Sequence, residues 1–236
     1  YQVVGITRND GDPSNASTVT WNVEFNNAVT GLTSSNFTLV DSGIDPSSLI
    51  SNVADVDGLN WTVEASVDAG DGTIGLDLTD GSTGLNAVMS NAPFAGDVYT
   101  IDRTAPVIVF DQNGTTVSDV NITGSIDDPL STMEISLDGG STFNTISVDG
   151  GGNWTYDLSS NGGFAGDNLY NLFLRGTDLA GNIEVPSGTT VTIDQTVPTL
   201  TSVSIGMDPT GNPNYARPGD VIDIAIISSE DITNVT

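Results

Sequence analysis

The side chains that can do chemistry in this sequence are carboxylates. Of its 236 residues, 31 are Asp or Glu, against four Arg and no Lys, His or Cys. Acid–base groups are then limited to carboxylates and Tyr, and because the acids lie in turns with no cleft-forming insertion, we expect no enzyme activity. Zinc and copper sites need His or Cys. Calcium, which takes roughly six to eight hard oxygen ligands, is the cation that this composition favours.

The charge balance also restricts the partners. A formal net charge of −27 argues against nucleic acid and anionic membrane surfaces, which are bound through clustered Lys and Arg. No apolar run approaches the ~20 residues of a membrane span, so we expect no direct membrane insertion. The chain begins at Tyr1 without an initiator Met or a signal peptide. We interpret it as a processed piece of a longer extracellular or cell-surface protein.

The elements that must position these acids are strands. The stretch "TVTWNVEF" (18–25) alternates apolar and polar residues with a period of two, as half-buried strands do. The same pattern recurs in "NWTVEASV", "TIGLDLTD", "TMEISLDG", "NWTYDLSS" and "NLYNLFLRGTD", with Gly, Asp and Asn turns between them. No segment carries a helical stripe with caps at both ends. We predict an all-β fold of tandem immunoglobulin-like antiparallel β-sandwich domains in an extended array.

A repeated phrase divides the chain. "TIDRTAPVIV" (100–109) returns as "TIDQTVPTLT" (192–201). In each copy a strand runs into a Thr-x-Pro break, and Pro marks the exit from one sheet and the start of another. The predicted units are 1–104, 105–197 and 198–236. The last offers about two strands, "TLTSVSI" and "DVIDIAII", too few for a sandwich, and we interpret it as the opening of another copy of the first unit.

Several motifs carry a family resemblance. "VEFNNAVTGLTSSNFTL", "GNWTYDL" and "FLRGTDLAGN", with Ile-Asp-x-Thr-x-Pro at each linker, resemble the tandem bacterial Ig-like (BIg-type) modules of large repetitive surface adhesins and biofilm-associated proteins. The resemblance covers essentially the whole chain. It implies extender modules for cell adhesion, often rigidified by calcium at their junctions. The first unit departs from the pattern, since "GLNAVMSNAPFAGD" stands near its end and Asp-x-x-Gly-Asn is missing.

Topology predicts where the acids meet. In a seven-strand Ig sandwich the loops after the second and sixth strands lie at the N-terminal pole, and those after the first and fifth at the C-terminal pole. The loops "SIDDPLS" and "TDLAGN" of the second unit therefore face the linker and the first unit's loops "NDGDPSN" and "DAGDG". We predict Ca²⁺ at this first junction, held by Asp102, Asp178 and Asn182. Further candidate ligands are Asp127, Asp128, Asp10, Asp12, Asp68 and Asp71.

At the second junction Asp194 repeats the role of Asp102. The further candidate ligands there are Asp111, Asp167, Glu230 and Asp231. Each loop Asp also has a purely structural interpretation, because an Asp in a Gly-rich turn caps its own backbone and tolerates left-handed φ. Both interpretations stay open for each residue taken singly.

Three functions are compatible with these patterns. The leading hypothesis is a structural extender of a large secreted or cell-surface adhesin, whose partners are the neighbouring Ig-like modules and whose cofactor is Ca²⁺. The second is a carbohydrate- or ligand-binding module, with residues 80–97 as its candidate loop. Trp21, Trp61 and Trp154 are candidates for a sugar platform, but their place in period-two strands favours core packing. The third is a protomer of an extracellular filament, completed by strand donation from other copies of the chain.

Overall fold

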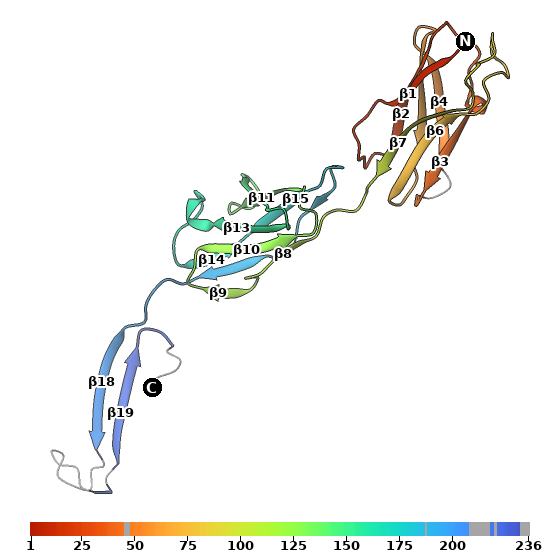
Figure 1. The fold of residues 1–236 in the computed structure, drawn as a ribbon. Helices are drawn as coiled ribbons and strands as arrows, with labels where there is room; N and C mark the ends of the chain where they lie inside the picture. The colour runs from red at the N-terminus through yellow and green to blue at the C-terminus, as the bar shows by residue number, and fades with distance from the viewer. Residues whose placement is uncertain (45–47, 187, 208–217, 220, 232–236) are drawn as a thin grey trace.

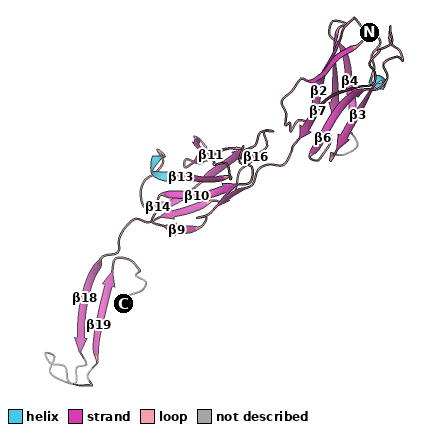
Figure 2. Ribbon diagram, viewed as in Figure 1, coloured by secondary structure: helices cyan, strands magenta, loops and turns pink. Residues whose placement is uncertain are grey.

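The computed structural model describes residues 1–44, 48–186, 188–207, 218–219 and 221–231. Three β-rich parts follow one another along an extended line (Figure 1). Within the described ranges, helix is confined to two short 3-10 turns, η1 (Ser34–Asn36) and η2 (Leu158–Ser160), and strands dominate (Figure 2). No helix of this part of the chain is long and apolar enough to cross a membrane. The predicted all-β fold class is confirmed.

Strands β1 to β7 form the first module, a sandwich of two antiparallel sheets. One sheet has the order β1-β2-β5-β4 and the other β3-β6-β7. The bounds are β1 Val3–Arg8, β2 Thr18–Phe25, β3 Phe37–Ser42, β4 Leu49–Asp55, β5 Asn60–Ser66, β6 Gly72–Leu78 and β7 Phe94–Ile101. This is the four-plus-three strand arrangement of a constant-type immunoglobulin domain.

The first module is held together by side chains that alternate along its strands. On β2, Val19, Trp21 and Val23 are fully buried, while Asn22 and Glu24 point to solvent. Burying one such apolar side chain contributes about 1.5–3 kcal/mol. The ring of Trp21 meets Tyr99 edge-on at 5.1 Å. Because Trp61 and Trp154 are also buried, all three tryptophans are core residues, as their strand pattern predicted.

Strands β8 to β17 form the second module. Its sheets have the orders β13-β10-β8, β12-β11-β15-β16 and β14-β17-β9. The bounds are β8 Ile108–Phe110, β9 Thr115–Val117, β10 Asn121–Ile126, β11 Thr132–Ser136, β12 Asn144–Ile146, β13 Asn153–Asp157, β14 Asn168–Asn171, β15 Phe173–Thr177, β16 Ile183–Glu184 and β17 Thr190–Ile193. The strand predicted as one stretch from 168 is broken at Leu172, where the chain passes from one sheet to another: β14 pairs with β17, and β15 pairs with β11 and β16. All pairs are antiparallel except β9 with β17, which is parallel.

Each module has its own hydrophobic core. The first cluster of buried apolar side chains extends from Val3 to Ile101 and the second from Ile108 to Ile193. The boundaries predicted at residues 104 and 197 fall outside both clusters and remain predictions. Since the cores are separate, each module carries its own folding energy.

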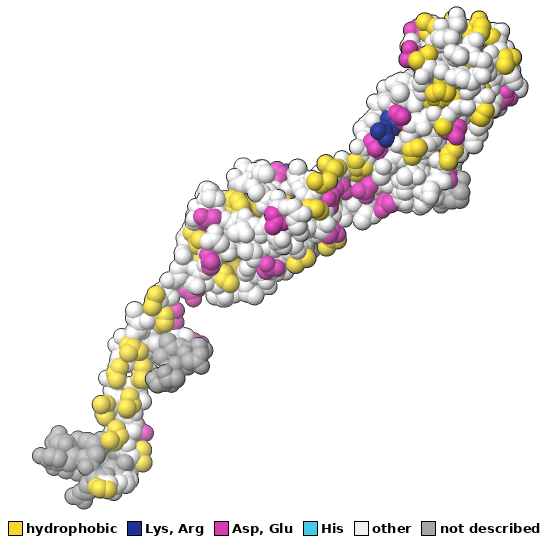
Figure 3. Space-filling model, viewed as in Figure 1, with side chains coloured by type: hydrophobic (Ala, Val, Ile, Leu, Met, Phe, Trp, Pro, Cys, Tyr) yellow, Lys and Arg dark blue, Asp and Glu magenta, His cyan; other side chains and the backbone are white. Residues whose placement is uncertain are grey.

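The described residues after the second module form a single hairpin, β18 (Leu200–Met207) paired antiparallel with β19 (Ile222–Ser228). We call it the C-terminal hairpin. Apolar side chains run along it in full view of solvent (Figure 3). In the described part of the chain, no other strand pairs with either of its strands.

Candidate junction site

The first linker is held by the module that precedes it. Asp71, in the loop between β5 and β6, accepts the Arg103 N–H at 2.6 Å through Oδ1 and the Thr104 hydroxyl through Oδ2. The linker's own Asp102 accepts the Thr104 N–H at 3.1 Å, which forms an Asx turn. The Thr104 hydroxyl, and next the Arg103 N–H, hold the pKa of Asp71 below its usual value.

The second linker repeats this arrangement atom for atom. Asp167 accepts the Gln195 N–H at 2.7 Å through Oδ1 and the Thr196 hydroxyl through Oδ2. Asp194 accepts the Thr196 N–H at 3.2 Å. The pKa of Asp167 is lowered for the same reasons, the Thr196 hydroxyl first and the Gln195 N–H second. We call this set of bonds, from a loop carboxylate to the Thr of Ile-Asp-x-Thr, the linker clasp.

Arg103 strengthens the first linker clasp with its side chain. Its guanidinium donates to the backbone carbonyls of Ala16 at 2.8 Å, of Val67 at 3.0 Å and of Asp68. These carbonyls belong to the β1–β2 and β5–β6 loops at the C-terminal pole of the first module, so one cation satisfies several backbone acceptors of two loops. The second linker has the neutral Gln195 at this position. The first linker is therefore tied to its module more firmly than the second.

On its other side, the first linker borders a hollow of about 250 Å³, which we call the junction hollow. Its lining is Asp102, Thr104, Ala105, Pro106, Asp127, Asp128 and Asp178. The acids come from the linker, from the loop after β10 and from the turn between β15 and β16, the two loops that topology predicted at this pole. Acidic side chains gather where the two modules meet (Figure 3).

The Asp-x-x-Gly-Asn motif is the turn that joins β15 to β16. Gly181 has φ +91°, the left-handed conformation that a side chain disfavours. Asp178 accepts the Asn182 N–H at 2.8 Å through Oδ1 and the Asn182 amide at 2.8 Å through Oδ2. Asp178 is 8 % exposed. The motif therefore buries a carboxylate at the junction and pairs it with a neighbouring amide.

Asn182 also reaches across the junction. Its Nδ2 donates to the backbone carbonyl of Asp102 at 2.9 Å, and its Oδ1 accepts from Nδ2 of Asn15 at 3.3 Å. Asn182 thus joins the second module both to the linker and to the loop between β1 and β2. The structure places the three predicted primary ligands, Asp102, Asp178 and Asn182, in one hydrogen-bonded group.

The donor set of the junction hollow fits calcium in chemistry. Its ligand atoms are hard oxygens, and in the described part of the chain no Arg forms an ion pair with any of its four carboxylates. Asp102 and Asp127 each use Oδ1 for a backbone N–H, and Oδ2 of neither makes a hydrogen bond to a described residue. As placed, no three acidic side chains of the described residues form a group that could hold a metal ion. Binding therefore requires these carboxylates to rotate toward one another.

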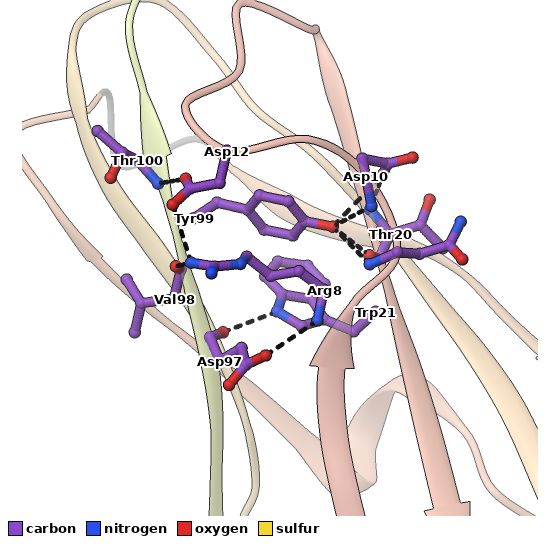
Figure 4. Close-up of polar contacts among 10 residues, drawn as sticks. Arg8, Asp10, Asp12, Thr20, Trp21, Asp97, Val98, Tyr99 and Thr100 are labelled. Carbon is purple, nitrogen blue, oxygen red and sulfur yellow. Dashed lines mark hydrogen bonds and ion pairs between the residues drawn. The ribbon is translucent and has the colours of Figure 1, made fainter. Parts of the chain in front are cut away.

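The other predicted ligands of the first module bond to groups of that module or of the linker. Asp12 accepts the Thr100 N–H at 2.6 Å and pairs with Arg8 at 2.9 Å (Figure 4). Asp10 accepts the Thr20 N–H at 2.9 Å. These bonds pin the loop between β1 and β2 to β7 and β2, and neither Asp lines the junction hollow. Asp68 contributes its backbone carbonyl to Arg103.

At the second junction the predicted ligands are dispersed. Asp111 accepts the Thr123 hydroxyl at 2.7 Å inside the second module, and Asp167 and Asp194 belong to the linker clasp. Glu230 accepts the Ser228 hydroxyl through its backbone carbonyl, and Asp231 is exposed. Among the described residues, these side chains form no group of three that could hold a metal ion.

Sequence reasoning missed the residues that hold the linkers. The sequence pattern assigns Thr104 and Thr196 only to a Thr-x-Pro break, and it predicts no role for Arg103 or Asn15. The repetition of the phrase was the available signal, because a Thr kept at the same place after Asp in both linkers indicates a side-chain contact made twice.

A larger hollow lies in the second module. It measures about 620 Å³ beside β14 and β15, and Leu169, Tyr170 and Phe173 are among its lining residues. None of its described lining residues carries a charged side chain. The predicted ligand loop 80–97 is not part of it, and that loop packs on the first module, with Met89 buried and Asn91 bonded to both backbone groups of Val3.

Comparisons with known proteins give similarity in structure only. No protein-family model matches the chain, and no curated protein matches it in sequence. Among solved structures, the Escherichia coli adhesin FdeC matches with 16% identity over 86% of this chain and 67% of that one, at a TM-score of 0.41. The FN1–FN3 domains of chicken CNTN1 match with 12% identity over 99% and 76%, at a TM-score of 0.32. The N-terminal part of the bacterial S-layer protein SbsC matches with 14% identity over 81% of this chain and 44% of that one, at a TM-score of 0.29.

Proposed function

We propose that the chain is a structural extender segment of a large secreted or cell-surface adhesin, which holds successive Ig-like modules in a line. The observation that carries this proposal is the linker clasp, built from the same residue types at both linkers. A short interdomain linker is by default a hinge. A linker in which two consecutive residues are hydrogen-bonded to the preceding module becomes an extension of that module, which is what a spacer needs.

The test is a distance measurement between modules. The chain has no Cys, so Val40→Cys with Leu169→Cys gives two unique spin-label sites on exposed strand positions of the first and second modules. We expect one narrow distance distribution by double electron–electron resonance. A distribution as broad as that of a freely jointed linker contradicts the extender function.

We further propose that Ca²⁺ completes the first junction. The residues that would hold it are Asp102, Asp127, Asp128 and Asp178, with the side-chain oxygen of Asn182 once its amide has turned over. When bound, the ion would neutralise carboxylates that have no cationic partner. For the second junction the proposed ligands remain Asp194, Asp167, Asp111, Glu230 and Asp231.

Calorimetric titration with Ca²⁺ tests this cofactor. We expect binding heat and a higher melting temperature, because the unfolded loops do not preform the site. Asp102→Ala with Asp178→Ala should abolish binding at the first junction, whereas Asp138→Ala with Asp149→Ala, two loop acids of the same module, should leave it intact. NaCl at equal ionic strength is the salt control. If Ca²⁺ titration gives no heat while the interdomain distance distribution is narrow, the calcium proposal is wrong and the extender function is retained.

The two other hypotheses have less support. A sugar-binding platform needs exposed aromatic rings, and the three tryptophans that motivated it are buried. The filament protomer depends on what the C-terminal hairpin binds.

A further inference from the structure

The C-terminal hairpin reproduces the β1–β2 pair of the first module. Each pair has one register shift, which lies just after Val3↔Phe25 in the first module and just after Leu200↔Ser228 in the hairpin. Beyond the shift both ladders continue in step. The two pairs therefore correspond residue by residue, which a resemblance of sequence alone does not establish.

The same reciprocal pair of hydrogen bonds stands beside the opening strand pair of both modules and of the C-terminal hairpin, and it marks equivalent residues in the three parts. In each, the residue before the first strand and the residue after the antiparallel partner of that strand (β2, β10 and β19) bond to each other twice. The partners are Gln2 with Asn26, Val107 with Asp127, and Thr199 with Ser229. In all three the side-chain oxygen of the second partner accepts the N–H of the first, at 2.8, 2.7 and 2.9 Å respectively.

This correspondence identifies which face of the hairpin belongs in a core. The equivalents of Val19, Trp21 and Val23, each 0% exposed, are Ile222, Ile224 and Ile226, which are 51%, 61% and 43% exposed. Glu24, which faces solvent, corresponds to Ile227. Three isoleucines thus occupy core positions in a part of the chain where nothing described covers them.

The first module shows what covers these positions. The edge of β2 that faces away from β1 pairs with β5, and Trp21 lies opposite Val63 in this pairing. The facing sheet supplies fully buried Ile74, Leu76 and Tyr99. Among the described residues both modules already use their strands for their own cores, so no spare strand remains for the hairpin.

We propose that the C-terminal hairpin is the acceptor surface for the remaining strands of a sandwich of the first-module type. The occupant is polypeptide that follows residue 236, and it places a strand on the free edge of β19 in the register of β5 on β2. The source follows from chain order, because in both modules the covering strands come after the opening pair in the same chain. This proposal is independent of calcium and of the linker clasp.

A chimera tests the register. Because Asn26 corresponds to Ser229, the chain is cut after Ser229 and continued with residues 27–104 of the first module. We expect a monomer in which the β19 amides exchange with solvent at least ~100-fold more slowly than in the 236-residue chain. Ile224→Glu should abolish this protection, because it puts a charge where Trp21 is buried. Ile227→Glu should preserve it, because Glu24 already stands there.

The first chimera can also lose protection because the isoleucines of the hairpin pack poorly against strands of the first module. A second chimera distinguishes this outcome from failure of the proposal. It carries Ile224→Trp and Ser228→Phe, which restore the first module's side chains at these positions. Lack of protection in both chimeras overturns the proposal. The 236-residue chain itself is examined by sedimentation. A monomer with fast-exchanging β19 amides supports the proposal, whereas a dimer dispersed by Ile224→Glu but not by Ile227→Glu makes a second copy the occupant and overturns it.

Discussion

Many of the described aspartates accept hydrogen bonds from groups of their own turn. Asp138 accepts the hydroxyls of Ser136 and Thr142, and these bonds, that of Ser136 first, lower its pKa. This is the turn interpretation that the sequence left open. Asp71 and Asp167 differ, because their partners lie on a linker about thirty residues further along the chain. Strand order places both acids at the junctions, as the sequence predicts. The Thr hydroxyls that they bind lie far away in sequence, so the pattern predicts Ca²⁺ as their partner instead.

Removing the clasp hydroxyls should loosen both linkers. Thr104→Val and Thr196→Val each delete one hydrogen bond from a hydroxyl to a carboxylate, that of Asp71 and that of Asp167 respectively. We expect faster amide exchange at residues 103–104 and 195–196 and a broader interdomain distance distribution. Thr142→Val is the matched control, since Thr142 donates to Asp138 at 2.6 Å away from any linker. Equal broadening in the control would show that the clasp does not set orientation.

The clasp should also open in acid. The folded-state pKa values of Asp71 and Asp167 lie below their usual values, so the clasp contributes fully above the unfolded pKa of about 3.9 and is lost as pH falls through the folded values. Interdomain distances recorded between pH 7 and pH 2.5 should broaden only below about pH 4. The double variant Thr104→Val/Thr196→Val, broad at neutral pH, should change less. Broadening centred near pH 6 would assign the transition to other groups.

At the scale of elements, periodicity predicted the long strands and failed on the short ones. "TVTWNVEF" coincides with β2, because one face of it lies on the core. Strands β8, β9, β12 and β16 have two or three residues, too few to show a period, and their pairing depends on neighbours distant in sequence. The break at Leu172 has the same cause. It occurs because β14 joins the sheet of β17 and β15 joins the sheet of β11, both of which are distant in sequence.

Separate cores predict separate unfolding transitions. Gly124 lies on β10 with its α-carbon against the Trp154 ring, and an added Cβ would come within 2.3 Å of that ring and 2.1 Å of the Val109 carbonyl. Gly124→Ala should therefore destabilise the second module by about 1–3 kcal/mol, the cost of overpacking. Calorimetry should show the melting temperature of the second module lowered by roughly 4–24 °C, with that of the first module unchanged.

The control for this change is Gly150→Ala, where the added Cβ meets nothing within 4 Å. Its transitions should stay within ~0.5 kcal/mol of the parent, the range of surface substitutions. If Gly124→Ala lowers both transitions together, the modules share folding energy and the assignment of two independent cores is wrong.

At the scale of the whole molecule, net charge does not fix the shape. The charge of −27 is spread along the array, and its long-range repulsion is screened beyond about 8–10 Å at physiological salt. Orientation must then come from contacts at the junctions, namely the linker clasps and the Asn182 contacts. The sequence predicted which loops meet at the first junction, because topology follows from strand order. It did not predict hydrogen-bond partners within that junction, which depend on side-chain geometry.

The parallel pairing of β9 with β17 has a consequence for the chain under tension. A pull on both ends draws β17 toward the C-terminal end and β9 toward the N-terminal end, so the three residue pairs Val191↔Thr115, Thr192↔Thr116 and Ile193↔Val117 are loaded together in shear. At the equivalent place the described residues of the first module form a single isolated parallel bridge, Ser14↔Ile101. In single-molecule stretching, which is governed by the unfolding rate, we expect the first module to rupture at the lower force. The second module would then be the last to extend, and Thr116→Pro, which places a ring in the sheared patch, should reverse that order.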